Sequence, residues 1–94
     1  MSNESAEHVA ALAFAFLAED KVRIGRFLDL TGISSDALAG LVGERTFLAG
    51  VLDHLMGDDA LILAFCANFD LKPNDVKRAH RLLVGVEAGE HGVK

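Results

Sequence analysis

Two short segments of this chain would be apolar nearly all the way round a helix. They are Val9–Ala18 (VAALAFAFLA) and Ala60–Ala67 (ALILAFCA). A helix on the surface of a globular protein has one apolar stripe and one polar face, and neither segment has such a polar face. Each segment is therefore predicted either to lie in the centre of the fold or to give one face to a partner. We expect the two helices that contain them to form the centre.

The remaining segments have the apolar spacing of short helices, and β-branched alternation typical of strands is lacking. Six helices are expected, at Ser5–Glu19, Lys21–Thr31, Ser35–Val42, Glu44–Met56, Asp59–Phe69 and Pro73–Val84. The predicted fold is all-α, a compact single-domain bundle of five to six short helices. A chain of 94 residues is long enough for one such core.

Local signals mark where these helices begin and end. Helix caps are expected at Asp20, at Asp58 and at Ser34 or Ser35. Gly32, Gly43 and Gly57 each follow helical spacing, as a left-handed glycine at a helix end would. The helical domain is therefore predicted over residues 1–84. Residues 85–94 have three glycines and little to bury, and we expect a disordered tail there.

Charge and cysteine content narrow the class of protein. The net charge of −5 argues against nucleic acid as a partner, because phosphate binding needs a basic excess. A single cysteine, Cys66, permits no intramolecular disulfide and fits a reducing compartment. The first residues carry Glu4 and Glu7 and no basic residue, unlike a signal peptide, and no apolar run reaches the roughly 18 residues of a membrane span. A cytoplasmic protein without membrane contact is expected.

One cluster of residues could bind a metal ion or transfer protons, namely Asp53, His54, Asp58 and Asp59. Helix capping explains the cluster better, because Asp58 and Asp59 stand where a helix begins and Gly57 interrupts the helical spacing. Cys66 lies in the most apolar segment and is interpreted as core packing. The sequence has no CxxC, GxSxG or phosphate-binding glycine loop. No catalytic, cofactor-binding or metal-binding residue is predicted, and we expect no enzyme.

Two helix faces are candidate interaction surfaces. On the Ser5–Glu19 helix, small residues surround one aromatic residue, which allows a close approach by a partner helix. This candidate interface comprises Ala11, Phe14, Ala15 and Ala18. The alternative, that this helix lies inside the bundle, stays open. On the Pro73–Val84 helix, three basic residues lie opposite its apolar residues. They form a solvated face, a docking face for an acidic protein surface or, last in order, a contact for nucleic acid. They are Lys77, Arg78 and Arg81.

Three classes of function follow, in this order. The first is a protein-interaction module, an adaptor or regulator that binds a protein partner or forms a homodimer through helix surfaces. The second is a binder of small apolar ligands, with a cavity between the Ser5–Glu19 and Asp59–Phe69 helices lined by Phe14, Phe16, Phe65 or Phe69. An enzyme ranks last, because no convergent polar constellation is visible.

Three stretches of the chain follow a recognisable order of motifs. They are FLAEDKVRIGRFLDLTGISSDAL (Phe16–Leu38), FLAGVLDHLMGDDALILAFC (Phe47–Cys66) and LKPNDV (Leu71–Val76). In this order and spacing the chain resembles an alphaproteobacterial family named domain of unknown function 3572, over about Ala6–Leu83. The resemblance implies a bacterial, cytoplasmic, all-helical protein. It implies no chemistry and no catalytic residues.

Overall fold

A computed structural model describes residues 1–85 of the chain. Its α-helices are α1 (Asn3–Ala18), α2 (Lys21–Thr31), α3 (Leu38–Leu41), α4 (Arg45–Met56), α5 (Asp59–Phe69) and α6 (Pro73–Val84). A 3₁₀ turn, η1 (Ser35–Ala37), precedes α3. No strand occurs in this range, so the predicted all-α class is confirmed. The tail expected over residues 85–94 lies outside the described residues, except for Gly85.

Most predicted helix bounds agree with the structure to within two residues. The exception is the helix expected over Ser35–Val42, which is a 3₁₀ turn followed by one turn of α-helix. None of the helices within residues 1–85 is both long and apolar enough to cross a membrane.

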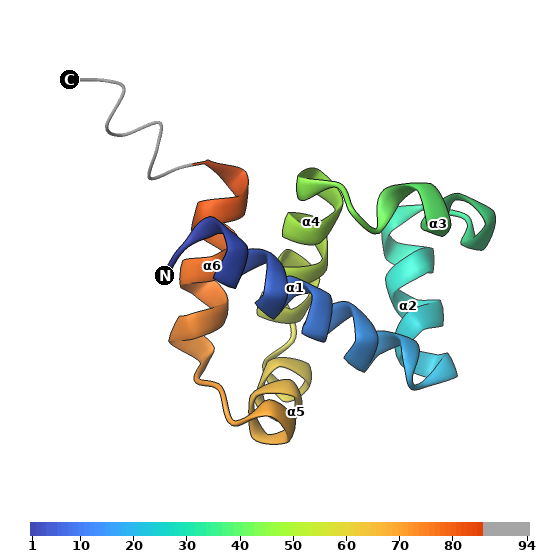
Figure 1. Ribbon diagram of the computed structural model, residues 1–94. Helices are drawn as coiled ribbons and strands as arrows, with labels where there is room; N and C mark the ends of the chain where they lie inside the picture. The colour runs from blue at the N-terminus through green and yellow to red at the C-terminus, as the bar shows by residue number, and fades with distance from the viewer. Residues whose placement is uncertain (86–94) are drawn as a thin grey trace.

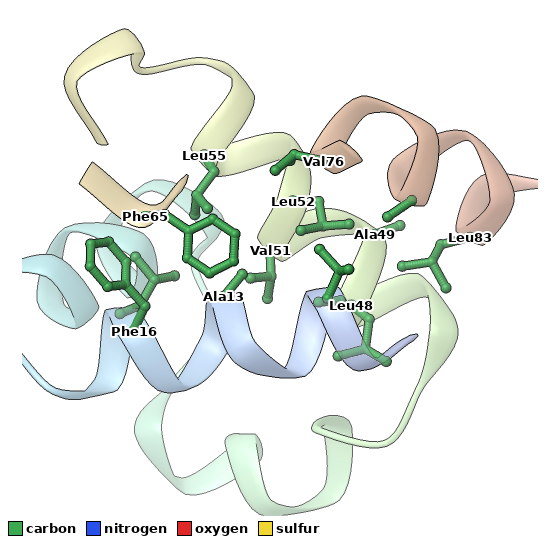
Figure 2. Packing of buried hydrophobic residues seen from close by; sticks show 14 of the residues in the cluster. Ala13, Phe16, Leu48, Ala49, Val51, Leu52, Leu55, Phe65, Val76 and Leu83 are labelled. Carbon is green, nitrogen blue, oxygen red and sulfur yellow. The ribbon is translucent and has the colours of Figure 1, made fainter. Parts of the chain in front are cut away.

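Three helices, α1, α4 and α6, pack against one another and form the main core. Figure 1 shows α1 crossing α6 and α4, with α2 and α3 beyond one end of α1 and α5 at another edge. One side of α1 is buried through Ala6, Val9, Ala10, Ala13, Phe16 and Leu17. The three alanines on this side have small side chains, which let the α1 backbone lie close to its neighbours. Figure 2 shows Ala13 and Phe16 on the side of α1 that faces Val51 and Phe65.

The most deeply enclosed helix is α4, and this corrects one prediction. Its buried residues are Phe47, Leu48, Ala49, Val51, Leu52 and Leu55. The prediction that the Asp59–Phe69 helix is central is wrong, because only Ile62, Phe65 and Cys66 of α5 are buried. An apolar helix can occupy an edge of the bundle as well as its centre, since helical spacing does not state how many neighbours a helix has.

The α2 helix is held to the rest of the fold by one fully buried side chain, Phe27. Its ring packs edge-on against Phe47 at 5.8 Å and against the imidazole of His54 at 5.2 Å. A second contact comes from Arg23, whose guanidinium lies 4.0 Å from the centre of the Phe16 ring. This is a cation–π contact between α2 and α1.

Two of the predicted helix caps are confirmed, and the cap of α1, made by the Ser2 side chain with the N–H of Ser5, was not predicted. The Asp20 carboxylate accepts hydrogen bonds from the N–H groups of Val22 and Arg23, and the Asp58 carboxylate accepts one from Leu61. Ser34 precedes η1, but its side chain makes no capping bond. The sequence could not distinguish this serine from a true cap, since the 3₁₀ turn that follows it has different geometry.

Glycine positions were predicted less well. Gly32 ends α2 with a φ of 76°, as expected. Gly57 has a φ of −83° and ends α4 in a right-handed conformation, and Gly43 does not have a positive φ either. At the end of α5 a non-glycine residue, Asp70, takes the left-handed conformation with a φ of 56°. Asp tolerates this conformation better than most side chains, so glycine alone is an incomplete marker.

Long-range hydrogen bonds, which the sequence did not reveal, connect the end of α6 to Arg45 at the start of α4. The Arg45 guanidinium donates to the backbone carbonyls of Leu83 at 3.2 Å and Leu82 at 2.6 Å. It also donates to the side-chain oxygen of Asn3 at 3.4 Å. These carbonyls belong to the last turn of α6, where the usual N–H partner four residues later in a helix is missing. The Leu82 carbonyl also accepts a hydrogen bond of 3.2 Å from the backbone N–H of Gly85. A basic group at a helix C-terminus is also favoured by the helix dipole.

Candidate functional site

The outer face of α5 consists of Ala60, Leu63, Ala64 and Ala67, and all four residues are exposed. Their spacing of three and four residues places them on one side of the helix. The opposite side, with Ile62, Phe65 and Cys66, is the buried one. Leu63 is the largest side chain of the outer face and is 58% exposed. The peripheral position of α5 therefore gives solvent a continuous apolar helix face.

Next to this face is a groove between α5 and α6, which we call the α5–α6 groove. Its volume is about 310 Å³. It is lined by Met56, Asp59, Ile62, Leu63, Pro73 and Lys77. Four of these six residues are apolar in their whole side chain, so most of the lining is hydrophobic. Leu63 belongs to both the outer face of α5 and the groove, which makes the two surfaces continuous.

The first turn of α6 forms one wall of this groove. Pro73 is the first helical residue, a position that suits its fixed φ. The Asp75 carboxylate accepts a hydrogen bond of 3.0 Å from the backbone N–H of Lys72, just before the helix. Together these residues define where α6 begins. Lys77 follows one turn later and reaches the groove.

The predicted basic face of α6 comprises Lys77, Arg78 and Arg81, and all three are exposed in the structure. The opposite side of the helix packs into the core through Val76, Ala79 and Leu83. The structure thus brings Lys77 to the α5–α6 groove and leaves the two arginines on the same outward side of α6. A docking role for this face stays a prediction.

The predicted interface on α1 is partly covered by the protein itself. Ala11, Ala15 and Ala18 are exposed. Phe14 is half-buried, with its ring packed edge-on against Phe47 at 5.6 Å. The aromatic residue of this face therefore already contacts α4, and the exposed part consists of small alanine side chains. Its role as an interface also stays a prediction.

The phenylalanines proposed to line a ligand cavity lie in two separate places. Phe16 packs edge-on against Phe65 at 5.6 Å and against Phe69 at 6.4 Å, and Phe65 and Phe69 are 5.2 Å apart. These three rings contact one another and occupy the space between α1 and α5. Phe14 is directed toward α4 instead. The structure therefore does not bring the four rings around one cavity.

The acidic cluster around His54 lines a second pocket of about 550 Å³, which shares Asp59 with the α5–α6 groove. Its lining residues are Arg26, Leu30, Asp53, His54, Gly57, Asp58 and Asp59. Asp58 is engaged as the cap of α5, and Asp53 lies 3.7 Å from the imidazole of His80. Within residues 1–85 no three histidine, cysteine or acidic side chains are arranged to hold a metal ion. The capping role of Asp58 accounts for the spacing of this cluster.

Burial lowers the pKa of His54 from its ordinary value. The charge of Asp58 opposes this shift, that of Arg26 adds to it and that of Asp53 opposes it. A histidine with a lowered folded-state pKa takes up its proton more readily in the unfolded chain. Its contribution to stability is present at neutral pH and is lost as the pH falls below the unfolded pKa of about 6.5.

We therefore expect the free energy of unfolding to decrease between about pH 7 and about pH 5.5, and the His54→Gln variant to lose part of this decrease. Urea denaturation at several pH values measures both. The exposed His8 on α1 provides the matched control, since His8→Gln should leave the pH profile unchanged. A wild-type profile that is flat, or one that His54→Gln does not alter, would contradict the expectation.

Cys66 lies in the core face of α5 and is buried, as predicted. Burial raises the pKa of its thiol, and the charge of Asp75 raises the pKa further. Both effects favour the protonated thiol over the reactive thiolate. The residue serves packing in this position.

The sequence analysis did not name the residues of the outer face of α5, Leu63 among them. A signal for this face was present, because the Ala60–Ala67 segment is apolar on all sides. Such a segment is either central in the fold or gives one face to a partner, and the second of these alternatives describes α5. The groove itself had no local signal. Met56, Leu63 and Lys77 belong to three helices and meet only through the fold.

Comparison with known proteins agrees with the resemblance found in the sequence. No curated protein and no solved structure matches this chain. The model of a family described as protein of unknown function (DUF3572) matches residues 3–86. This match covers all six helices and nearly the whole chain. The chain therefore belongs to the DUF3572 family of proteins of unknown function.

Proposed function

We propose that this protein is a protein-interaction module, an adaptor or regulator, that binds a protein partner through the outer face of α5 and the α5–α6 groove. The observation that supports this is the position of α5. Its sequence is apolar on every side, yet only one side is buried by the fold. The function needs no catalysis, and we propose that the protein is not an enzyme and acts in the cytoplasm.

The energetic argument rests on Leu63. Complete burial of a leucine side chain contributes roughly 1.5–3 kcal/mol relative to leaving it exposed. In this protein Leu63 is 58% exposed where the outer face of α5 meets the α5–α6 groove, so much of that contribution is available to a partner. Apolar residues surrounded by a rim of polar ones are the usual core of an interface. Asp59 and Lys77 supply polar rim groups at the groove.

The proposal is tested by placing a photocrosslinking amino acid at position 63, in the cells that produce the protein naturally. The matched control is position 30 on α2. Leu30 is also an exposed leucine, at 71%, and it does not line the α5–α6 groove. We expect a protein to be crosslinked from position 63 and not from position 30. Mass spectrometry then identifies this protein for purification.

The affinity of the purified partner decides the test. Leu63→Asp should weaken its binding at least about ten-fold, as loss of a central apolar contact does. Leu30→Asp should leave its binding unchanged. Both variants must first be shown to be folded by circular dichroism. Equal affinities for wild type and Leu63→Asp would show that the outer face of α5 is not the binding surface.

A further inference from the structure

We infer that the occupant of the α5–α6 groove is an acidic amphipathic helix of a partner protein. This inference rests on the proposed function and names the class of partner. Two kinds of observation support it, the shape and lining of the groove and the distribution of charge beside it.

The shape of the site suits a helix. Two helices, α5 and α6, form its walls, and Ile62, Leu63 and Pro73 contribute apolar lining from both. An amphipathic helix binds such a groove by inserting apolar side chains spaced three or four residues apart. Met56 also lines the groove, and its unbranched side chain can adjust to anchors of different shape.

The charged residues beside the groove indicate the sign of the charge on the partner helix. The chain as a whole has a net charge of −5, but Lys72, Lys77, Arg78 and Arg81 are four of its nine lysines and arginines. Lys77 lines the groove, and Arg81 follows it by one helical turn on the same side of α6. Arg78 is exposed beside them. A helix in the groove would therefore have a row of positive charges along one flank.

The acidic residues nearest the groove do not lie within this row. The Asp75 carboxylate is bonded to the backbone N–H of Lys72, inside the first turn of α6. Asp59 belongs to the first turn of α5, on the opposite wall of the groove, where the helix dipole favours a negative charge. The flank formed by α6 remains positive. Carboxylates on the partner helix would complement it and speed association.

A second copy of this chain fits the site less well. A symmetric dimer places the same surface patch of two subunits face to face. Each copy would then bring its own Lys77 and Arg81 into the one interface. An excess of like charges within an interface disfavours association. An acidic helix from a different protein instead meets these residues with opposite charges, and Asp59 is the one acidic residue in the groove lining.

The test is a selection from a displayed library of helical peptides, with acidic, neutral and basic members, against the full chain. We expect the selected peptides to share apolar residues spaced three or four apart and an excess of Asp and Glu. Their affinity is then measured for the wild type and for Leu63→Asp. A drop of about ten-fold or more places the peptide in the groove. Leu63→Ala, which removes most of the apolar contact without adding a charge, is the second variant, should Leu63→Asp fail to fold.

The charge is tested with the double variant Lys77→Glu and Arg81→Glu. It should bind the selected peptides about ten-fold more weakly, and raising salt from about 0.05 M to about 0.5 M should weaken wild-type binding more than binding by the double variant. Lys21→Glu, at an exposed lysine on α2, is the matched control and should change nothing.

The outcomes separate the two proposals. Peptides that depend on Leu63 but lack acidic residues and ignore the double variant would overturn the inference and leave the proposed function standing. A wild-type dimer that Leu63→Asp converts to a monomer would overturn it in the same way, with a second copy as the occupant. Peptides unaffected by Leu63→Asp, or a library without binders, would also overturn the inference. The crosslinking experiment then decides the proposed function independently.

Discussion

Replacing Phe27 with alanine is expected to lower the free energy of unfolding by about 3–5 kcal/mol, the usual cost of deleting a buried aromatic side chain. Phe27 is 1% exposed and is the only fully buried residue of α2. Its ring contacts Phe47 and His54, both on α4. The cavity left by the substitution would therefore lie at the junction between α2 and α4.

The position of this junction predicts which helices the Phe27→Ala substitution should destabilise most. Amide hydrogen exchange should increase first in α2, η1 and α3, because Phe27 belongs to α2, and α2 and α3 lie together at one end of the bundle (Figure 1). Urea denaturation gives the total loss. Phe27→Leu retains much of the buried volume and should lose less, and Leu30→Ala, at an exposed leucine, should lose little. A loss below about 1 kcal/mol would show that Phe27 is not the anchor of α2.

A second large loss of stability is expected when Ala10 of α1 is replaced with leucine, but not when its neighbour Ala11 is. Ala10→Leu should destabilise the protein by about 1–3 kcal/mol, because the added atoms would have to fit into a packed core. Ala10 has 0% exposure and lies on the side of α1 that faces the core. Ala11→Leu should change the free energy of unfolding by no more than about 0.5 kcal/mol, since Ala11 is exposed.

The pair of variants makes its own control, since both add the same atoms to adjacent positions of one helix. Their difference is read from urea denaturation curves measured in parallel. Ala11 also belongs to the interface predicted on α1, so sedimentation of Ala11→Leu tests that prediction at the same time. Similar destabilisation by both variants would mean that α1 is enclosed on all sides, contrary to the structure.

Much of the fold was predictable because helix bounds depend on nearby residues. Asp20 and Asp58 cap the helices that they were expected to cap, since a carboxylate reaches N–H groups only two or three residues away. Pro73 begins α6 for an equally local reason, the fixed φ of its ring. Ser34 and Gly57 were predicted wrongly because other local conformations satisfy the same positions.

The sequence predicted several residues of the candidate site but not their arrangement in space. The sequence identified the basic residues of α6 and the apolar character of α5, but it did not bring Lys77 and Leu63 to one groove. It also gave no sign that Arg45 would bond to the carbonyls at the end of α6, nearly forty residues later in the chain. Such contacts depend on how helices are placed, not on their spacing.

The short helices, the caps at Asp20 and Asp58 and the all-α class could be predicted from the residues alone, because hydrogen bonding within helices and apolar periodicity are local. The sequence by itself also determined that Val9–Ala18 and Ala60–Ala67 carry more apolar surface than one stripe. How each segment uses that surface depends on its place in the fold. The α1 helix packs against α2, α4 and α6, whereas α5 packs mainly against α4 and α6 at one edge of the bundle and leaves Leu63 in solvent. Burial is a property of the neighbours that a helix acquires, and the packing of distant segments selects those neighbours.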